Sequence, residues 1–244
     1  MTRQTTNTHL TIIEQPSPNH DARPDGVAID MLLLHYTGMR SGAEALARMC
    51  DPAAEVSAHY CIEEDGSVLR LVPEARRAWH AGASAWAGVE RVNACSIGIE
   101  LVNPGHDWGY RPFPEPQMQS LIALAKDILA RHSIPPARVL GHSDVAPQRK
   151  EDPGELFDWA LLAAEGIGLW PGKVAPLANL LSMQEIQGLL YDYGYAVPQH
   201  GRLDNETRAV IRAFQRHFRP QAVTGEPDGE TAARLEALIA LKDG

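Results

Sequence analysis

The chain has 244 residues, a formal net charge of −9 at pH 7 and a pI near 5.5. This length allows one large domain or two, with an ample core. The acidic balance argues against a nucleic-acid binder, because such proteins carry a basic footprint. No apolar stretch approaches the roughly 18 residues of a membrane span. The three cysteines lack CxxC spacing and predict reduced thiols rather than a disulfide framework or a thiolate metal site.

The amino-terminal segment MTRQTTNTHLTIIEQ is polar and lacks the apolar region of a secretory signal. It predicts no classical export. The expected location is therefore the cytoplasm by default, with the periplasm or cell envelope open through a non-classical route.

The first strong element is the apolar run from Ile29 to Leu34, which Asp30 alone interrupts and which predicts a strand buried on both faces. His35 follows at its carboxyl end. A lone histidine there is usually a hydrogen-bonded structural residue. However, residues that end neighbouring strands converge at one rim of a sheet, and polar residues at such a rim often form a site.

A helix and a hairpin follow. Ser41 and Glu44 form a capping-box pattern for a helix that extends to about Met49. A hairpin with its turn at Asp65–Gly66 places His59 on its first strand, where a structural role is expected.

The run AWHAGASAW, residues 78–86, combines small residues with two tryptophans and a histidine. Trp79 and His80 would suit a loop that lines a groove, since aromatic rings stack on sugars and peptide backbone. Alternatively, the tryptophans pin the loop to the core. Both interpretations remain open from the sequence.

Residues 96–102 predict a central strand that carries Glu100 near its end. The loop after it, residues 103–116, contains three aromatic side chains and is long enough to be a candidate wall of a substrate groove. A helical stripe that begins with Met118 follows Pro116 and ends before Pro135.

The segment GHSDVAPQRKEDPG, residues 141–154, follows a short predicted strand at Val139–Leu140 and is rich in turn residues. His142 and Asp152 are ten residues apart in a bent loop, so both can reach one ion. His35 is the best third ligand. Two histidines and one carboxylate leave the fourth zinc position open, which is the catalytic arrangement.

Glu155 to Glu165 predicts a last helix of this domain, and Pro and Gly residues then mark a boundary. The expected organisation is a catalytic domain over 1–168, a linker over 169–180 and a helical domain over 181–244. Three helices are expected in the last part, at about 182–193, 204–218 and 228–241. Ser182 with Glu185 forms another capping box, and Asp204 and Asp228 are expected caps.

The helical domain resembles the small three-helix peptidoglycan-binding domain, particularly in Gly194-Tyr195, Thr207 and Ala213-Phe214-Gln215. Arg208, Arg212 and Arg216 recur every four residues on its second helix. A solvated helix face is the expected explanation; a stripe that binds carboxylates of cell-wall peptides is the alternative.

Four motifs of the first domain occur in the order found in a known family: LLLHYTG, AWHAG, SIGIE and GHSDVAPQRKEDPG. Over about residues 25–170 the chain resembles the zinc-dependent N-acetylmuramoyl-L-alanine amidases of the AmpD-like group. The resemblance implies an α/β fold with a mixed central sheet flanked by helices, followed by the all-α three-helix bundle.

The resemblance also implies roles for single residues. It places one zinc ion per chain on His35, His142 and Asp152, a catalytic carboxylate on Glu100 and a catalytic lysine on Lys150. The implied reaction is hydrolysis of the amide bond between N-acetylmuramic acid and L-alanine in peptidoglycan or its muropeptide fragments. Zinc lowers the pKa of water from 15.7 toward about 7, Glu100 is placed to move a proton, and Lys150 can face the developing oxyanion.

Two alternatives share this chemistry or this fold: a non-catalytic peptidoglycan-recognition protein and a zinc peptidase of the stem peptide. The sequence leaves open the choice between intact wall, soluble fragments and anhydro-muropeptides, as well as the oligomeric state. The helical domain is expected to hold the enzyme on an extended substrate, with a structural brace as the competing role.

Overall fold

The computed structural model describes residues 10–243. Most of the amino-terminal segment on which the export expectation depends, residues 1–9, lies outside them. Among the helices within 10–243, none is long and apolar enough to cross a membrane.

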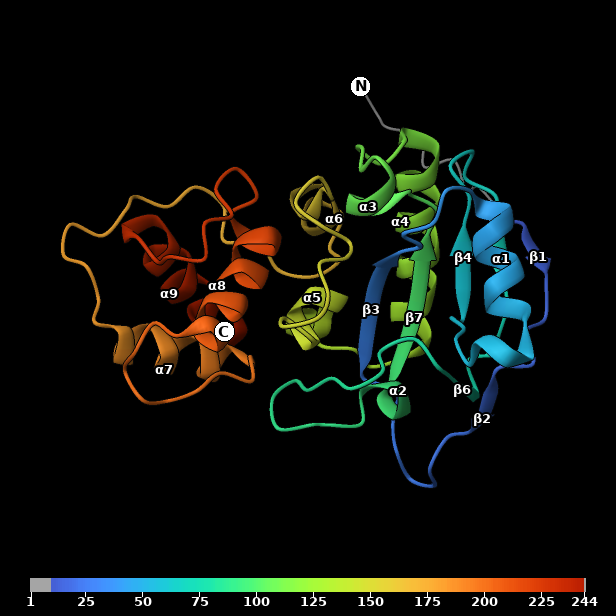
Figure 1. Ribbon diagram of the computed structural model, residues 1–244, viewed down its shortest axis with the longest axis horizontal. Helices are drawn as coiled ribbons and strands as arrows, with labels where there is room; N and C mark the ends of the chain where they lie inside the picture. Colours follow the sequence, from blue (N-terminus) through green and yellow to red (C-terminus); the bar gives the residue numbers. More distant parts are fainter. Residues whose placement is uncertain (1–9, 244) are drawn as a thin grey trace.

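The amino-terminal half is built on a six-stranded mixed sheet with the strand order β1-β5-β4-β7-β3-β8 (Figure 1). Its members are β1 (Ile12–Glu14), β3 (Met31–Tyr36), β4 (Tyr60–Ile62), β5 (Val68–Arg70), β7 (Ser96–Leu101) and β8 (Val139–Gly141). β3 is parallel to both neighbours, whereas β4 and β5 form the predicted antiparallel hairpin. A separate ribbon pairs β2 (His20–Ala22) with β6 (Arg76–Ala78). The predicted fold class is confirmed.

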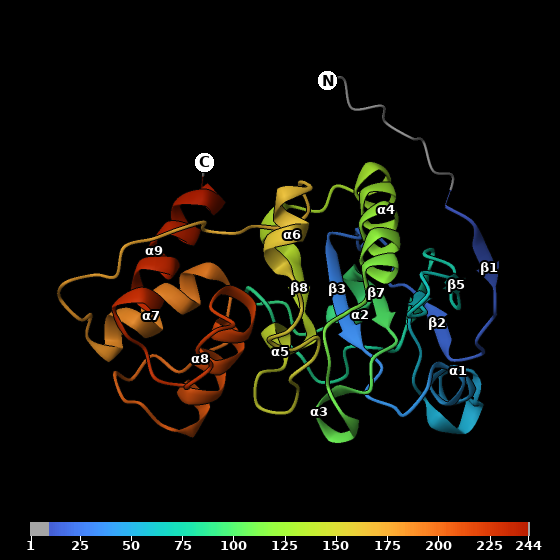
Figure 2. The same ribbon diagram turned by 90° about the horizontal axis from the view of Figure 1, so that it is seen from above.

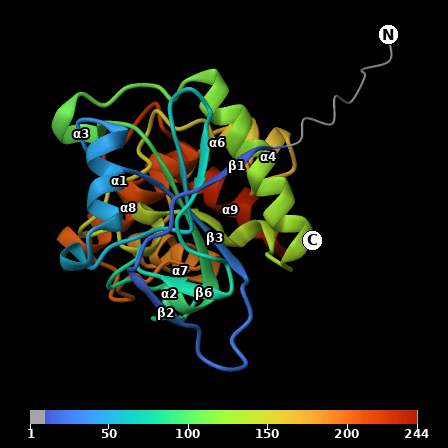
Figure 3. The same cartoon turned by 90° about the vertical axis from the view of Figure 1, so that its right-hand side faces the viewer.

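Helices cover the two faces of this sheet. The apolar side of α4 (Glu115–Arg131) packs with Leu32, Leu34 and Ile99 on one face. On the other face, α1 (Gly42–Cys50) places Ala45 and Met49 against the β4–β5 part of the sheet. Figure 3 shows the two helices on opposite sides of the strands. Alternation along β3 therefore sends its even-numbered residues toward α4 and its odd-numbered residues, His35 included, the other way.

Several short helices connect these elements. They are η1 (Pro52–Ala54), α2 (Val92–Cys95), α3 (Gly105–Trp108), η2 (Pro136–Arg138), α5 (His142–Val145) and α6 (Trp159–Ala164). The helix expected from Glu155 begins only at Trp159, because the side chain of Asp158 accepts from the Leu161 amide and caps it there. The turn α5 was expected to be loop; Asp144 makes it possible by accepting from the Gly141 amide at 2.8 Å.

The carboxyl-terminal half consists of α7 (Met183–Tyr193), α8 (Asn205–Phe218) and α9 (Gly229–Asp243), in agreement with the three expected helices (Figure 2). The capping box of Ser182 and Glu185 is present. Asp204 and Asp228 accept from the Thr207 and Thr231 amides as expected.

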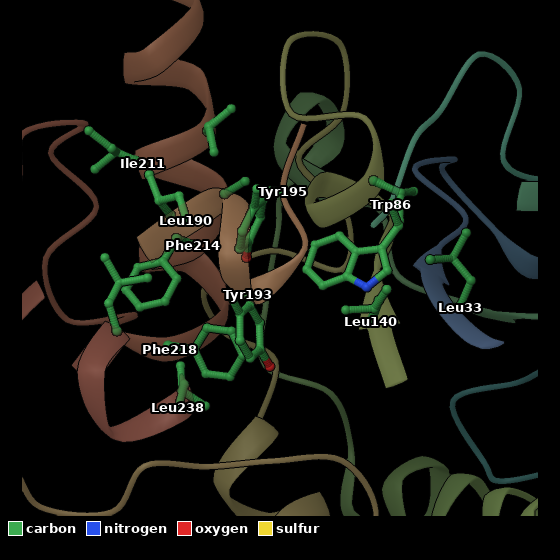
Figure 4. Close-up of a cluster of buried hydrophobic side chains, with 14 of the residues drawn as sticks. Leu33, Trp86, Leu140, Leu190, Tyr193, Tyr195, Ile211, Phe214, Phe218 and Leu238 are labelled. Carbon is green, nitrogen blue, oxygen red and sulfur yellow. The ribbon is translucent and has the colours of Figure 1, made fainter. Parts of the chain in front are cut away.

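One hydrophobic cluster runs through both halves of the molecule. The indole of Trp86 is buried between Leu33 and Leu140 of the sheet on one side and Tyr193 and Tyr195 of the bundle on the other (Figure 4). The Ala87 amide donates to the Gly194 carbonyl at 2.7 Å. The loop that contains AWHAGASAW is thus pinned to a core, and this core belongs to both halves.

Candidate active site

The sheet brings the predicted site residues to one rim. His35 of β3 and Glu100 of β7 are direct partners in the parallel register. β8 pairs on the other side of β3 and leads into α5, whose first residue is His142. Parallel strands end at the same edge, and this is why residues more than sixty positions apart share one site.

Three potential ligand atoms form a small triangle at this rim. Nδ1 of His35 lies 3.0 Å from Nδ1 of His142 and 3.0 Å from Oδ2 of Asp152, and the third side of the triangle measures 3.1 Å. All three side chains are buried. Zinc bonds of about 2.0–2.2 Å in tetrahedral geometry require ligand atoms roughly 3.3 Å apart. The residues therefore fit a zinc ion with little rearrangement.

The outer ring nitrogens determine which tautomers these histidines adopt. Nε2 of His142 faces the carbonyl of Ala81 at 3.0 Å and must donate to it. Nε2 of His35 lies 3.1 Å from Nδ1 of His80, whose own Nε2 is 3.3 Å from the Ser96 hydroxyl. This hydroxyl donates to the Val92 carbonyl at 2.7 Å.

Because the Ser96 proton is used on a carbonyl, its oxygen accepts from His80, and His80 in turn accepts from His35. Each Nδ1 of the pair His35 and His142 then presents a lone pair beside the Asp152 carboxylate. Three Lewis bases about 3 Å apart repel one another unless a cation lies between them, which is a physical argument for a metal site. The guanidinium of Arg149 also approaches Nε2 of His142, at 3.4 Å, but the carbonyl is the closer partner.

Electrostatics favour the ligating forms of His35 and Asp152. Burial, with a smaller effect of the neighbouring His142, lowers the pKa of His35 to about 4 against the opposing effect of Asp152. Burial raises the pKa of Asp152, but the close approach of His142 and His35 outweighs burial and places this pKa well below the usual range. Neutral histidines and an ionised carboxylate are the forms that bind zinc.

Glu100 lies beside the triad with an unused acceptor. Its Oε2 is buried and has no hydrogen-bond partner among residues 10–243. Burial and, to a lesser degree, the charge of Asp152 raise the pKa of Glu100 well above its usual value, against an opposing effect of Lys150. A carboxyl group with these properties in a cavity is typical of a general base.

His142 and Asp152 of the triad line a cavity of about 390 Å³, together with Glu100, Lys150 and His106. His106 belongs to α3, so the loop after β7 does contribute a wall to this cavity. Asp107 joins it there. The exposed Trp108 of the same loop is instead covered by the guanidinium of Arg40, 4.1 Å from its ring centre.

The predicted substrate-binding pair is divided by the structure. His80 lines the cavity, but its ring lies behind His35 and holds that ligand. Trp79 is not among the cavity's lining residues; its backbone bonds Ser57, and its side chain interacts with Asp21 of β2. A role of either residue in binding substrate stays a prediction.

His59 has the expected structural role. Its Nδ1 accepts from the Gly98 amide at 2.9 Å. Burial and the charge of Arg23 lower its pKa to about 3, so it stays neutral.

Sequence reasoning missed the residues that support the ligands. Ser96 orients His80, and Gly98 makes room for it, since a Cβ at this position would lie 2.5 Å from the imidazole. A glycine within an otherwise apolar central strand was the available signal for such a close approach.

Comparisons with known proteins agree with this geometry. Residues 25–155, more than half of the chain, match the family model described as N-acetylmuramoyl-L-alanine amidase, and residues 181–235 match that of a putative peptidoglycan binding domain. The chain belongs to the N-acetylmuramoyl-L-alanine amidases and is an enzyme of that class.

Individual relatives cover both halves. N-acetylmuramoyl-L-alanine amidase AmiD of Escherichia coli is 42% identical over 93% of this chain and 90% of its own length. Its structure, a complex with the substrate anhydro-N-acetylmuramic acid-L-Ala-D-gamma-Glu-L-Lys, superposes with a TM-score of 0.79 at 41% identity and covers 89% of this chain and 92% of AmiD.

Two further relatives differ in length. AmpDh3 from Pseudomonas aeruginosa, in complex with anhydromuramic pentapeptide, has a TM-score of 0.79 at 32% identity over 99% of both chains. The 1,6-anhydro-N-acetylmuramyl-L-alanine amidase AmpD of Enterobacter cloacae is 38% identical but matches only 59% of this chain, with 84% of its own length covered.

Proposed function

We propose that the enzyme uses one zinc ion on His35, His142 and Asp152 to hydrolyse the amide bond between N-acetylmuramic acid and L-alanine. The observation that carries the proposal is the triangle of ligand atoms, 3.0–3.1 Å apart, two of whose residues, His142 and Asp152, line the same cavity as Glu100. When bound, zinc supplies a Lewis acid that lowers the pKa of water and polarises the substrate carbonyl.

Glu100 is proposed as the proton carrier. Its free Oε2 can accept a proton from the attacking water. The same carboxyl group then gives this proton to the leaving nitrogen, which departs as the amino group of the stem peptide. Its raised pKa makes the carboxylate a stronger base toward the attacking water.

Lys150 is proposed to stabilise the tetrahedral oxyanion. It lines the same cavity, and its ammonium group can donate to an oxygen that gains negative charge during the reaction. Its position two residues before Asp152 fixes its backbone relative to the metal site.

Peptidoglycan or its muropeptide fragments are the proposed substrates. Support comes from the muropeptide complexes of AmiD and AmpDh3 and from the second domain of the chain. The competing reaction, cleavage inside the stem peptide by the same metal chemistry, predicts different products.

The test combines metal analysis with product analysis. Wild-type protein should hold one equivalent of zinc and release intact stem peptide with a free L-alanine amino terminus from a soluble muropeptide, as seen by mass spectrometry. His142→Ala should lose both zinc and activity. A full equivalent of zinc in His142→Ala contradicts the site, and shortened peptides contradict the proposed bond.

A further inference from the structure

Asp144 occupies a central position between the two halves of the enzyme. It lies in α5, two residues after the ligand His142, and its side chain is fully buried. Oδ2 accepts from the Gly141 amide at 2.8 Å, which closes the turn that presents His142. A buried carboxylate is costly unless every oxygen finds a donor.

The remaining donors come from the carboxyl-terminal half. The hydroxyl of Tyr195 donates to Oδ1 of Asp144 at 2.6 Å, and Nδ1 of His217 donates to Oδ2 at 2.7 Å. Both donors are buried. Within residues 10–243, the bundle therefore supplies two of the three hydrogen bonds to this carboxylate.

The orientation of His217 is itself fixed. Its ring is stacked between Trp159 of α6 and Phe218, with both centroid distances 3.7 Å. Tyr195 is held by Trp86, whose ring centre lies 4.8 Å away (Figure 4). Two rigid aromatic contacts thus determine where the donors to Asp144 can be.

A second contact holds the other end of the same loop. Arg216 of α8 is buried apart from 9% of its surface and forms an ion pair with Glu151, the residue between Lys150 and Asp152. The interpretation of Arg216 as part of a solvated helix face is wrong for this reason. The bundle contacts the loop beside His142 and again beside Asp152.

We propose that Tyr195 and His217 are positioning residues of the metal site, which act through Asp144 on His142. The bundle then has a function apart from any contact with the cell wall: it keeps the ligand loop in the geometry that binds zinc. This inference rests on the proposed metal site. Outer partners of metal ligands commonly change metal affinity about 10- to 100-fold when removed, and Asp144 is such a partner through the backbone of α5.

The decisive comparison uses two tyrosines of the same aromatic cluster. Tyr195→Phe removes the hydroxyl that donates to Asp144. Tyr193→Phe removes the hydroxyl of a similarly buried tyrosine, and no hydrogen bond of that hydroxyl is found in the described part of the chain, so it is the matched control. The full-length proteins are stripped of metal and titrated with zinc against a chromophoric chelator, and the visible spectrum of the cobalt form is recorded.

We expect Tyr195→Phe to raise the zinc dissociation constant on the order of 10-fold and to alter the cobalt spectrum, while Tyr193→Phe stays within about twofold of wild type. Unchanged affinity in Tyr195→Phe, or equal losses in both variants, overturns the proposal. Neither readout requires amidase activity. Absence of zinc binding in the wild type would instead refute the proposed function.

A second pair keeps the test decisive if Tyr195→Phe fails to fold. His217→Asn retains an N–H donor near the position of Nδ1, whereas His217→Leu retains only the bulk. Zinc affinity should be preserved in the first variant and reduced about 10-fold in the second. Equal affinities in the two variants would show that the donor to Asp144 does not position the ligand.

Discussion

Two backbone carbonyls determine the protonation of the metal site at the level of single residues. Ala81 O takes the outer proton of His142, and Val92 O takes the proton of Ser96, which orients His80 and through it His35. Both carbonyls accept and cannot donate, so they leave the inner nitrogens free to bind a cation.

Glu100→Gln tests the role of the carboxylate apart from metal binding. The amide keeps the shape of the side chain but cannot carry the proton, so we expect kcat to fall about 10²–10⁴-fold. Zinc content should remain at one equivalent. A variant with nearly normal turnover would mean that another group moves the proton.

The pH dependence tests the same residue in another way. Glu100 must be ionised to accept a proton, so kcat/KM should rise with pH through its apparent pKa. Burial raises this pKa and the charge of Lys150 lowers it. Lys150→Ala should therefore shift the acidic limb to higher pH, whereas Lys150→Arg, which keeps the charge, should leave it in place. An unshifted limb in Lys150→Ala would contradict this electrostatic coupling.

At the level of elements, the six residues of β7 supply both core side chains against α4 and side chains of the site. Ile97 and Ile99 face α4, whereas Gly98 and Glu100 face the site, so alternation alone places the base beside the metal ligands. The strand has room for the imidazole of His80 only because residue 98 has no side chain.

Gly98→Ala should displace His80 and weaken zinc binding. The added Cβ of residue 98 would lie 2.5 Å from the imidazole of His80, closer than any normal contact. This imidazole cannot easily move away, because it is held by His35 and Ser96. We expect a loss of zinc affinity of about 10-fold in the chelator titration. Gly188→Ala in α7 is the control, since no atom lies within 4 Å of its added Cβ. It should retain wild-type affinity and gain about 0.5–1 kcal/mol of stability.

At the level of the whole molecule, Trp86 links the halves. It belongs to the catalytic half, yet it packs against Tyr193 and Tyr195, and a Cβ on Gly194 would lie 2.7 Å from its ring. A shared core of this kind makes the halves unfold together.

We expect the wild type to unfold in one calorimetric transition, and Trp86→Ala to cost about 3–5 kcal/mol and to unfold in two. Trp108→Ala removes a half-exposed tryptophan outside this core and should preserve one transition. Two transitions in the wild type would contradict the shared core.

Truncation near Pro176 bears on the role of the bundle. If the bundle only tethered the enzyme to its substrate, its removal would leave hydrolysis of a soluble muropeptide unchanged and would weaken only the binding to sacculi. The structure favours a brace, because removal exposes Trp86 and deprives Asp144 of two donors. We expect the truncated protein to lose zinc affinity and solubility together. A soluble, fully active truncated domain would restore the tether as the main role.

The sequence by itself determined the elements and most of the site. Strand ends, helix caps and the family motifs are local patterns, and they placed His35, Glu100, His142 and the Lys150–Asp152 segment correctly at one rim of a mixed sheet. The start of α6 and the turn α5 were missed, because single side chains, Asp158 and Asp144, decide them.

Only the tertiary structure decided how the two halves are joined. Arg216 repeats with Arg208 and Arg212 at the spacing of an exposed helix face, but the fold brings it against Glu151, 65 positions away. Tyr195 and His217 likewise reach Asp144 from 51 and 73 positions away. A local sequence pattern predicts which side of a helix is polar. The partner of a buried polar group depends instead on packing between segments that are distant in the sequence, and a local pattern does not predict this packing.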